Sequence, residues 1–237
     1  MQRFPVMLFA AGFGTRMGEM TRECPKPLLK VAGRCLLDHA LEQTRAAGLQ
    51  RRVVNLHYHG DQIAQHLAGQ DIVLSWEPEI LETGGGLRQA LPLLGAGPVF
   101  TLNTDAVWAG RNPLVELSAA WSEPQMEALL LLAPAGAGAR ADFVLDGAGR
   151  IARANGQPGL VYLGAQIIRT EGLAAIPQRA FSLNLLWDRL IAEGRAYGVV
   201  HSGRWCDVGR PEGIASAEAM LAQFGDGKFG DGKFGNG

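Results

Sequence analysis

The sequence predicts an α/β fold with a doubly wound, mixed and mainly parallel sheet and a smaller α+β part. Short apolar runs of the kind that form buried parallel strands recur along the first half of the chain. Segments with helical spacing of apolar residues separate them, and this alternation is typical of a doubly wound sheet. After about residue 135 the alternation gives way to shorter strand-like segments, which predict the α+β part.

The first half of the chain alternates predicted strands and helices. Residues 6–11 form a continuous apolar run that stops at Gly12, as expected of a buried strand. The predicted strands lie at residues 6–11, 53–58, 72–76, 99–103 and 128–133, with a short extended piece at 28–31. The predicted helices lie at residues 36–47, 61–67, 83–94 and 114–121. The helix at 83–94 begins with Gly84–Gly85–Gly86, and such a costly first turn indicates that something approaches its backbone closely.

The second half begins with a predicted hairpin. Residues 142–145 and 150–153 flank Asp146–Gly147, a pair that favours a tight turn. Further strands are predicted at residues 160–168, 197–201 and 204–208, and helices at 183–191 and 211–224. No linker separates the halves, which predicts one domain over residues 1–224. Residues 225–237 repeat Gly-Asp-Gly-Lys-Phe and are predicted to be a low-complexity tail.

Composition excludes several classes of protein. Of the 237 residues, 47% are hydrophobic and 19% are charged, which suits a folded core and excludes disorder for most of the chain. The 22 basic and 23 acidic residues give a net charge of −1, so neither a nucleic-acid partner nor a membrane surface is expected. The apolar runs are too short to cross a bilayer. Three cysteines without CxxC spacing predict reduced thiols and a cytoplasmic protein.

A glycine-bearing loop follows the first predicted strand. Gly12 and Gly14 lie at the carboxyl edge of the sheet, where such folds bind ligands, and successive N–H groups there could bind phosphate oxygens. Arg16 adds a planar cation suited to phosphate. The loop matches neither the dinucleotide fingerprint, which needs a third glycine, nor the P-loop, which needs a lysine. An ordinary strand-to-helix turn therefore remains an alternative interpretation.

One lysine and two aspartates are further candidates. Lys26 lies between Pro25 and Pro27, which predicts an extended backbone and a lysine that meets a phosphate at little entropic cost. Asp105 follows a buried strand, and Asp207 ends a strand-like segment near the C-terminus. Two such carboxylates could hold one Mg²⁺, with phosphates and waters completing its coordination. The alternatives are a solvated loop lysine, and for each aspartate a helix cap or turn former.

These segments together resemble the signature of the sugar-1-phosphate nucleotidyltransferases. The resemblance rests on the strings Phe-Ala-Ala-Gly-Phe-Gly-Thr-Arg-Met at residues 9–17, Pro-Lys-Pro-Leu at 25–28, Leu-Glu-Thr-Gly-Gly-Gly at 81–86, Asn-Thr-Asp at 103–105 and Trp-Cys-Asp-Val-Gly at 205–209. Within that family, the short length and strings such as Asn-Leu-His-Tyr at residues 55–58 are similar to the N-acetylmuramate 1-phosphate uridylyltransferases. Two positions depart from the family pattern. The family usually has a small or polar residue where this chain has Phe13, and a glycine where it has Thr104.

The resemblance implies a fold of the nucleotide-diphospho-sugar transferase type, in which two parts of the chain bind different ligands. Residues 1–135 would bind the nucleotide and residues 136–224 the sugar. It implies that Arg16, Lys26 and Asp105 are catalytic and that Asp105 and Asp207 bind Mg²⁺. The implied nucleotide-binding residues are Ala11, Gly12, Phe13, Gly14, Thr15, Arg16, Lys26, Thr83, Gly84 and Asn103. Asp142 and Gly164 are the candidates for contacts with the sugar.

The expected reaction is the transfer of a nucleoside monophosphate from a nucleoside triphosphate, UTP by the resemblance, to a sugar 1-phosphate. N-acetylmuramate 1-phosphate is the expected acceptor, in peptidoglycan recycling, and the protein is expected to be a monomer or a small homo-oligomer. Three alternatives remain at this point. They are a thymidylyl- or guanylyltransferase for another hexose 1-phosphate, a non-catalytic nucleotide-sugar-binding module, and a dehydrogenase, which would need the fingerprint that the loop lacks.

Overall fold

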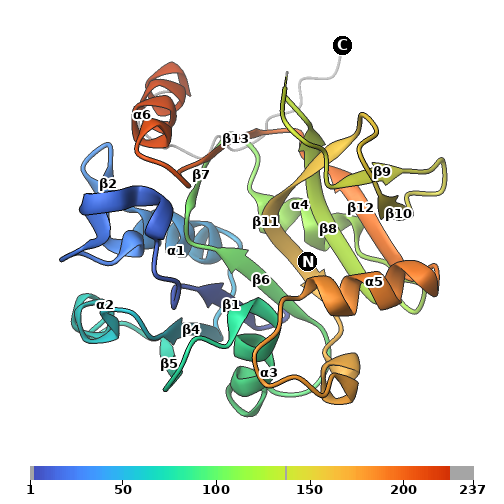
Figure 1. The fold of residues 1–237 in the computed structure, drawn as a ribbon, viewed down its shortest axis with the longest axis horizontal. Helices are drawn as coiled ribbons and strands as arrows, with labels where there is room; N and C mark the ends of the chain where they lie inside the picture. The colour runs from blue at the N-terminus through green and yellow to red at the C-terminus, as the bar shows by residue number, and fades with distance from the viewer. Residues whose placement is uncertain (1–2, 137, 225–237) are drawn as a thin grey trace.

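The computed structural model describes residues 3–136 and 138–224, and strands from both halves of the chain share one nine-stranded sheet (Figure 1). Its central order is β5–β4–β1–β6–β11–β8–β12, and the hairpin β9–β10 pairs with the start of β11. Strands β1, β4, β5 and β6 are parallel, whereas β11 runs antiparallel to both β6 and β8. The strands of this sheet are β1 (Val6–Phe9), β4 (Arg52–Leu56), β5 (Val73–Trp76), β6 (Val99–Asn103), β8 (Ala128–Pro134), β9 (Phe143–Leu145), β10 (Ile151–Arg153), β11 (Leu160–Ile168) and β12 (Ala196–Val200). The predicted mixed, mainly parallel sheet is confirmed.

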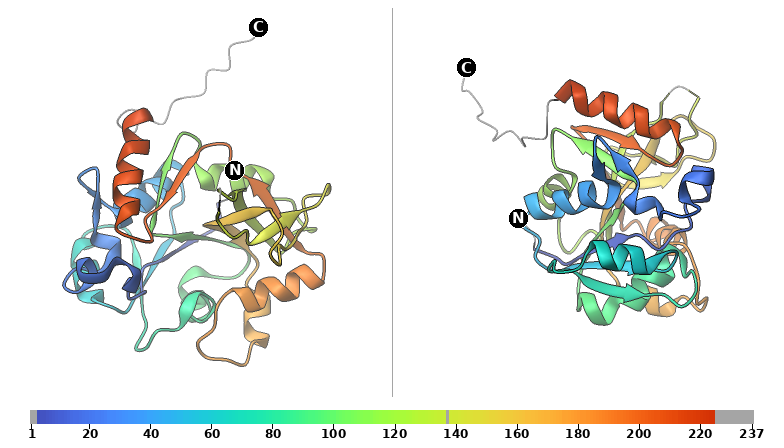
Figure 2. Two further views of the ribbon diagram at one scale, coloured as in Figure 1. Left: turned by 45° about the horizontal axis from the view of Figure 1, so that its top comes forward. Right: turned by 90° about the vertical axis from the view of Figure 1, so that its left-hand side faces the viewer.

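Helices cover both faces of this sheet (Figure 2). On one face α1 (Leu36–Ala46), α2 (Gly60–His66) and α4 (Pro113–Ala120) pack against inward side chains such as Val6 and Leu8. On the other face α3 (Glu82–Leu94) and α5 (Asn184–Ala192) bury Met7 and Val53. Alternate residues of β1 thus enter opposite cores, as the two-residue period of a strand requires.

A third, smaller core lies beneath α6 (Glu212–Phe224). It joins Met17 and Leu36 to Val107 on β7 (Ala106–Ala109) and to Val208, which follows β13 (Arg204–Asp207). Strands β7 and β13 form an antiparallel pair, and β2 (Lys30–Val31) pairs with β3 (Arg34–Cys35). The β7–β13 pair brings the C-terminal part of the chain back to the end of β6 (Figure 1).

Two of the three glycines of α3 allow a close approach by a distant segment of the same chain, and the third, Gly86, leaves room for Glu77. A Cβ at Gly84 would lie 2.3 Å from the Phe181 ring, and one at Gly85 would lie 2.5 Å from the Arg179 carbonyl oxygen. The Phe181 carbonyl accepts hydrogen bonds from the N–H groups of both Gly84 and Gly85. These are N–H groups that the first turn of a helix leaves without an internal partner, so the docked segment completes the helix start.

Most predicted elements are found within two residues of their expected ends, but two expectations need correction. Strand β3, and strand β7 directly after Asp105, were not predicted. Lys26 is not extended, because it begins the 3₁₀ helix Lys26–Leu28, in which the Pro25 and Lys26 carbonyls accept from Leu28 and Leu29. Those two hydrogen bonds outweigh the steric preference of a residue before proline. The tail predicted at residues 225–237 lies outside the described residues. None of the described helices is long and apolar enough to span a membrane.

Candidate active site

The glycine loop links β1 to the 3₁₀ helix Thr15–Thr21 and lies against Lys26. Gly14 has φ of 65°, in the left-handed region. A Cβ at Gly14 would lie 2.9 Å from Lys26 Cβ, so glycine is needed both for this conformation and for the approach of the lysine. The Thr21 hydroxyl donates to the Gly14 carbonyl over 3.2 Å and holds the turn.

Four charged side chains that lie far apart in the sequence come together beside this loop. The ammonium of Lys26, whose residue is only 8% exposed, lies 2.8 Å from Asp105 Oδ2. Asp207 ends β13, where it pairs with Ala106, and the N–H of Val208 donates to the Asp105 carbonyl. A Cβ placed on Gly209 would lie 2.5 Å from Asp207 Oδ2 and 3.2 Å from both terminal nitrogens of Arg16. The Arg16 guanidinium and the Asp207 carboxylate therefore converge over Gly209, beside the Lys26–Asp105 pair.

The chemistry of this donor set fits a divalent cation. Partial removal from water, and next the negative charge of Asp105, raise the pKa of the Asp207 carboxyl, although Asp207 as a residue keeps an exposed side. The charges of Lys26 and Arg16 lower the same pKa. Two carboxylates that repel each other at one open edge provide the oxygen ligands that Mg²⁺ prefers, and a bound cation would relieve their repulsion.

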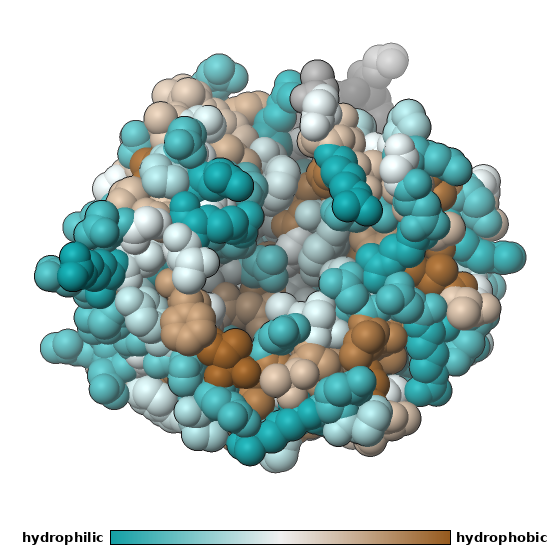
Figure 3. All heavy atoms as spheres, in the orientation of Figure 1, coloured by the Kyte–Doolittle hydropathy of each residue, from teal (hydrophilic) through white to brown (hydrophobic). Residues whose placement is uncertain are grey.

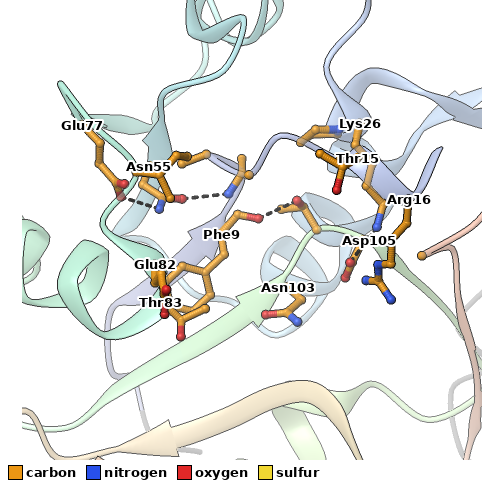
Figure 4. Close-up of a pocket in the computed structure, with 18 residues that line it drawn as sticks. Phe9, Thr15, Arg16, Lys26, Asn55, Glu77, Glu82, Thr83, Asn103 and Asp105 are labelled. Atoms are coloured by element: carbon orange, nitrogen blue, oxygen red, sulfur yellow. Dashed lines mark hydrogen bonds and ion pairs between the residues drawn. The ribbon is translucent and has the colours of Figure 1, made fainter. Parts of the chain in front are cut away.

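A buried hydrogen-bond network shapes the opposite side of the site (Figure 4). Asn55 at the end of β4 accepts from the Ala10 amide over 2.7 Å and donates to Glu77 Oε1 over 2.6 Å. Glu77 Oε2 accepts from the Leu81 amide over 3.1 Å. Burial raises the pKa of Glu77, and the Asn55 and Leu81 hydrogen bonds oppose that rise. The sequence interpretation missed Glu77, yet it directly follows a predicted strand, the same signal that identified Asp105.

A cavity of about 290 Å³ joins these two sides. The cavity opens on the face shown in the surface view, which is hollowed near its centre (Figure 3). Most of the predicted phosphate- and nucleotide-binding residues line it, together with Asn55 and Glu77. The predicted residues in its wall are Ala11, Gly12, Gly14, Thr15, Arg16, Lys26, Thr83, Asn103 and Asp105. The arrangement places Arg16, Lys26 and Asp105 at one end of the pocket and Asn55 and Glu77 at the other (Figure 4).

A second cavity of about 270 Å³ continues from the first. The two share Phe9, Thr83 and Asn103, so a ligand could extend from one into the other. Asp142, predicted to contact a sugar, lies in the second cavity. The remaining wall comes largely from the hairpin β9–β10, from β11 and from the segment that leads into α5.

Four predicted binding residues lie outside both cavity walls, and one of them, Asp207, lies next to Gly209, which lines the first cavity. Phe13 is 48% exposed and packs edge-on against His57 and Tyr58, so it does not obstruct the phosphate loop. Gly84 lies beneath Phe181, and Gly164, with φ of 81°, allows Asn103 to pack within 2.8 Å of where a Cβ would stand. The unusual Thr104 is buried and donates to the Phe9 carbonyl over 2.7 Å, which fastens the residue before Asp105 to β1.

Comparison with known proteins adds a family and several relatives. Residues 6–171 match the family model described as a MobA-like NTP transferase domain. The chain is 42% identical over 233 residues to an N-acetylmuramate alpha-1-phosphate uridylyltransferase of Caulobacter vibrioides, covering 92% of this chain and 96% of that one. It is 34% identical over 230 residues to the enzyme of that name from Neisseria meningitidis, covering 92% and 98%. A putative glucose-1-phosphate thymidylyltransferase from Bacillus anthracis, in complex with a sucrose, shares the fold with a TM-score of 0.79, 16% identity and coverage of 95% and 98%.

Proposed function

Because the chain belongs to the family of MobA-like NTP transferase domains, we propose that it transfers uridine monophosphate from UTP to N-acetylmuramate 1-phosphate and releases pyrophosphate. The resemblance to sugar-1-phosphate nucleotidyltransferases inferred from the sequence is confirmed. The chain is an enzyme of that class, and the similarity over nearly the whole length of two uridylyltransferases supports the choice of base and sugar.

One observation carries the assignment of the reacting site. Arg16, Lys26 and Asp105 line one end of a cavity together with the glycine loop, and Asp207 lies beside them at Gly209. A reaction between two phosphate esters needs this combination, since both reactants are anions and repel each other. The proposed roles place Arg16 and the loop on the β- and γ-phosphates, and Lys26 between the α-phosphate and the incoming sugar phosphate.

The chemistry requires little of the protein beyond position and charge. An oxygen of the sugar phosphate attacks the α-phosphorus, and the bond from that phosphorus to the pyrophosphate oxygen breaks. The nucleophile is already an anion, so no side chain has to remove a proton. Lys26 and Arg16 would stabilise the charge that spreads over the phosphoryl oxygens in the transition state. Asp105 and Asp207 would hold one Mg²⁺, which when bound would screen the charge of the α-phosphate.

The two connected cavities suit the two halves of the product. The Asn55–Glu77 network and Thr83 border the part of the first cavity proposed to receive the base. The sugar would occupy the second cavity, where Asp142 could accept hydrogen bonds from its hydroxyl groups. Asn103 borders both cavities and would contact the junction between nucleotide and sugar.

We also propose that the protein acts in the cytoplasm. Cys24, Cys35 and Cys206 are all free thiols in the structure. Unpaired cysteines are typical of a reducing compartment, which is also where nucleoside triphosphates are available to an enzyme.

Pyrophosphate release tests the proposed function. UTP, TTP and GTP would each be assayed with N-acetylmuramate 1-phosphate and with glucose 1-phosphate in the presence of Mg²⁺. We expect the pair of UTP and N-acetylmuramate 1-phosphate to give a kcat/KM at least about tenfold above every other pair. A higher value with another base or sugar would contradict the proposed substrates within the same class. UTP binding without pyrophosphate release from any acceptor would support a non-catalytic module.

A further inference from the structure

The second cavity contains a cation that the sequence interpretation did not single out. Among the described residues that line this cavity, one has a cationic side chain. It is Arg153, the last residue of β10. Asp142 and Asp188, the acids of this region, each accept a hydrogen bond from the protein. Asp142 accepts from the Tyr162 amide over 2.9 Å, and Asp188, whose side chain is 56% exposed, accepts from Arg153 itself.

The Arg153 guanidinium is held in a fixed orientation. Its Nε donates to Asp188 Oδ1 over 2.7 Å, and one terminal nitrogen, Nη2, donates to Asn184 Oδ1 over 2.8 Å. Its central carbon lies 4.9 Å from the centre of the Phe143 ring and 5.9 Å from that of Trp187. Contacts on one edge and on an aromatic face leave little rotational freedom, so the side chain is arranged before any ligand arrives.

The aromatic support of Arg153 is itself rigid. The Trp187 indole N–H donates to Gln166 Oε1 over 2.9 Å, and the Gln166 amide donates to the Thr101 hydroxyl over 3.0 Å. Gln166 and Thr101 are both completely buried on adjacent strands. The wall behind the guanidinium is therefore anchored in the central sheet.

One edge of the guanidinium remains available. Within the part of the chain that the structure describes, the second terminal nitrogen, Nη1, donates to no protein acceptor. An arginine has five N–H donors, and those that Asp188 and Asn184 leave unused are suited to a carboxylate. A half-buried cation with free donors, in a wall of a sugar-sized cavity, indicates an anionic substituent on the ligand.

We propose that Arg153 recognises the lactyl carboxylate of N-acetylmuramate 1-phosphate and thereby selects this sugar. The inference rests on the proposed function. N-acetylmuramate differs from N-acetylglucosamine by a lactic acid ether on its third carbon, so the carboxylate is the one charged group that separates the two sugars. With the phosphate held by Lys26 in the first cavity, the sugar extends past Asn103 into the second, where Arg153 meets the carboxylate.

The test compares the two sugars on the full-length protein. The kcat/KM values for N-acetylmuramate 1-phosphate and N-acetylglucosamine 1-phosphate would be measured with UTP for the wild type, Arg153→Met and Arg153→Lys. We expect Arg153→Met to lose about 10- to 100-fold with the muramate and at most about threefold with the glucosamine substrate. Arg153→Lys keeps the charge without the planar fork, and it should recover part of the loss.

Arg150→Met is the matched control, because Arg150 lies on the same hairpin and lines neither cavity. Its two kcat/KM values should equal those of the wild type. The KM for UTP and the melting temperature of each variant establish that the nucleotide site is intact.

The outcomes separate this inference from the proposed function. A wild type that favours the muramate substrate, together with an Arg153→Met variant that keeps the same preference, overturns the role of Arg153 and leaves the proposed function in place. Equal losses with both sugars also overturn it, since they indicate a purely structural arginine. A wild type without preference for the muramate substrate contradicts the proposed acceptor, and the inference fails with it.

Discussion

Lys26 is a buried cation whose position depends on its neighbours along the chain. Gly14 gives it room, the 3₁₀ helix Lys26–Leu28 directs it, and Asp105 accepts a hydrogen bond from its ammonium over 2.8 Å. A charge removed from water acts more strongly on a phosphate than an exposed one does. Substrate phosphates that enter the cavity would compete with Asp105 for this ammonium. The free site therefore already holds the lysine where a phosphate would bind.

The first prediction concerns this lysine. Lys26→Ala should lower kcat/KM by about 10²-fold or more, since an interaction made with the transition state is lost. Lys30→Ala, which removes an exposed lysine of β2, is the control and should leave kcat/KM unchanged. Continuous measurement of pyrophosphate release distinguishes the two. Near-normal turnover in Lys26→Ala, with a melting temperature close to that of the wild type, would remove the lysine from the reaction.

Glu77 should make the stability of the fold depend on pH. Burial raises its pKa above the ordinary value of 4.5, so the folded state binds this proton more tightly than the unfolded state. The stabilisation from Glu77 is thus fully present below the unfolded-state pKa and is lost as the pH rises through the raised folded-state pKa. Above both values the ionised carboxylate remains buried, supported by Asn55 and Leu81.

The second prediction follows from that sign. The free energy of unfolding of the wild type, measured relative to Glu77→Gln by urea titration, should fall as the pH increases from about 4 towards 7. The side-chain amide that Glu77→Gln introduces retains an acceptor for the Asn55 amide but loses the one that receives the Leu81 N–H, which adds an offset independent of pH. Only the slope is diagnostic, and a difference that stays constant over this range would contradict the prediction.

The convergence of the proposed reacting residues could be predicted from the sequence because each stands in a short motif with a physical meaning. Glycines after a strand, a lysine between prolines and aspartates at strand ends are all local signals. Arg153 carries no such signal, because its orientation depends on Asp188, 35 residues further along, and on a helix that packs beside the hairpin. Phe13 shows the converse, since its motif position suggested a phosphate contact and its side chain instead packs on His57 and Tyr58.

At the scale of elements, the long regular segments and the short hairpin β9–β10 were predictable, whereas the short strands β3 and β7 were not. The predicted ends of β6 and β11 agree with the structure, because an apolar run bounded by polar or turn residues defines a central strand. Strand β7 has four residues, and its partner β13 lies about 100 residues away in the sequence. Its existence depends on that pairing and on the core under α6, neither of which a local pattern records.

The third prediction concerns the docked start of α3. Gly85→Ala would gain about 1 kcal/mol of helix propensity, but its Cβ would lie 2.5 Å from a backbone carbonyl oxygen of Arg179. Because backbone on a docked segment yields less readily than a side chain, we expect a net loss of about 1 to 3 kcal/mol in the free energy of unfolding.

Gly147→Ala is the matched control for this substitution, since no atom lies within 4 Å of the added carbon and its φ is not positive. Chemical denaturation should show a change of less than about 0.5 kcal/mol for it. If Gly85→Ala proved as stable as the wild type, Gly84 and Gly85 would have to be explained by something other than the approach of residues 179–181.

At the scale of the whole molecule, the two halves of the chain share one sheet and contribute to the same buried cluster on it. Strand β11 belongs to the proposed sugar-binding half, yet it pairs with β6 and contributes Leu163, Ala165 and Ile167 to the same buried cluster as Val6 and Leu8. The β7–β13 pair returns Asp207 to Asp105 in the same way. A site that takes charged residues from both halves therefore exists only when both are folded together.

The last prediction follows from this shared core. Thermal unfolding followed by calorimetry should give one transition whose calorimetric and van't Hoff enthalpies agree, and a chain ending at residue 135 should not fold, because the apolar edge of β6 would lose its partner. Disruption of β11, for example by Ala165→Asp in the centre of the shared core, should lower the melting temperature of the entire protein in that single transition. Two separable transitions in the wild type, or a folded fragment of residues 1–135, would indicate that the halves are independent domains and that the active site forms by docking them.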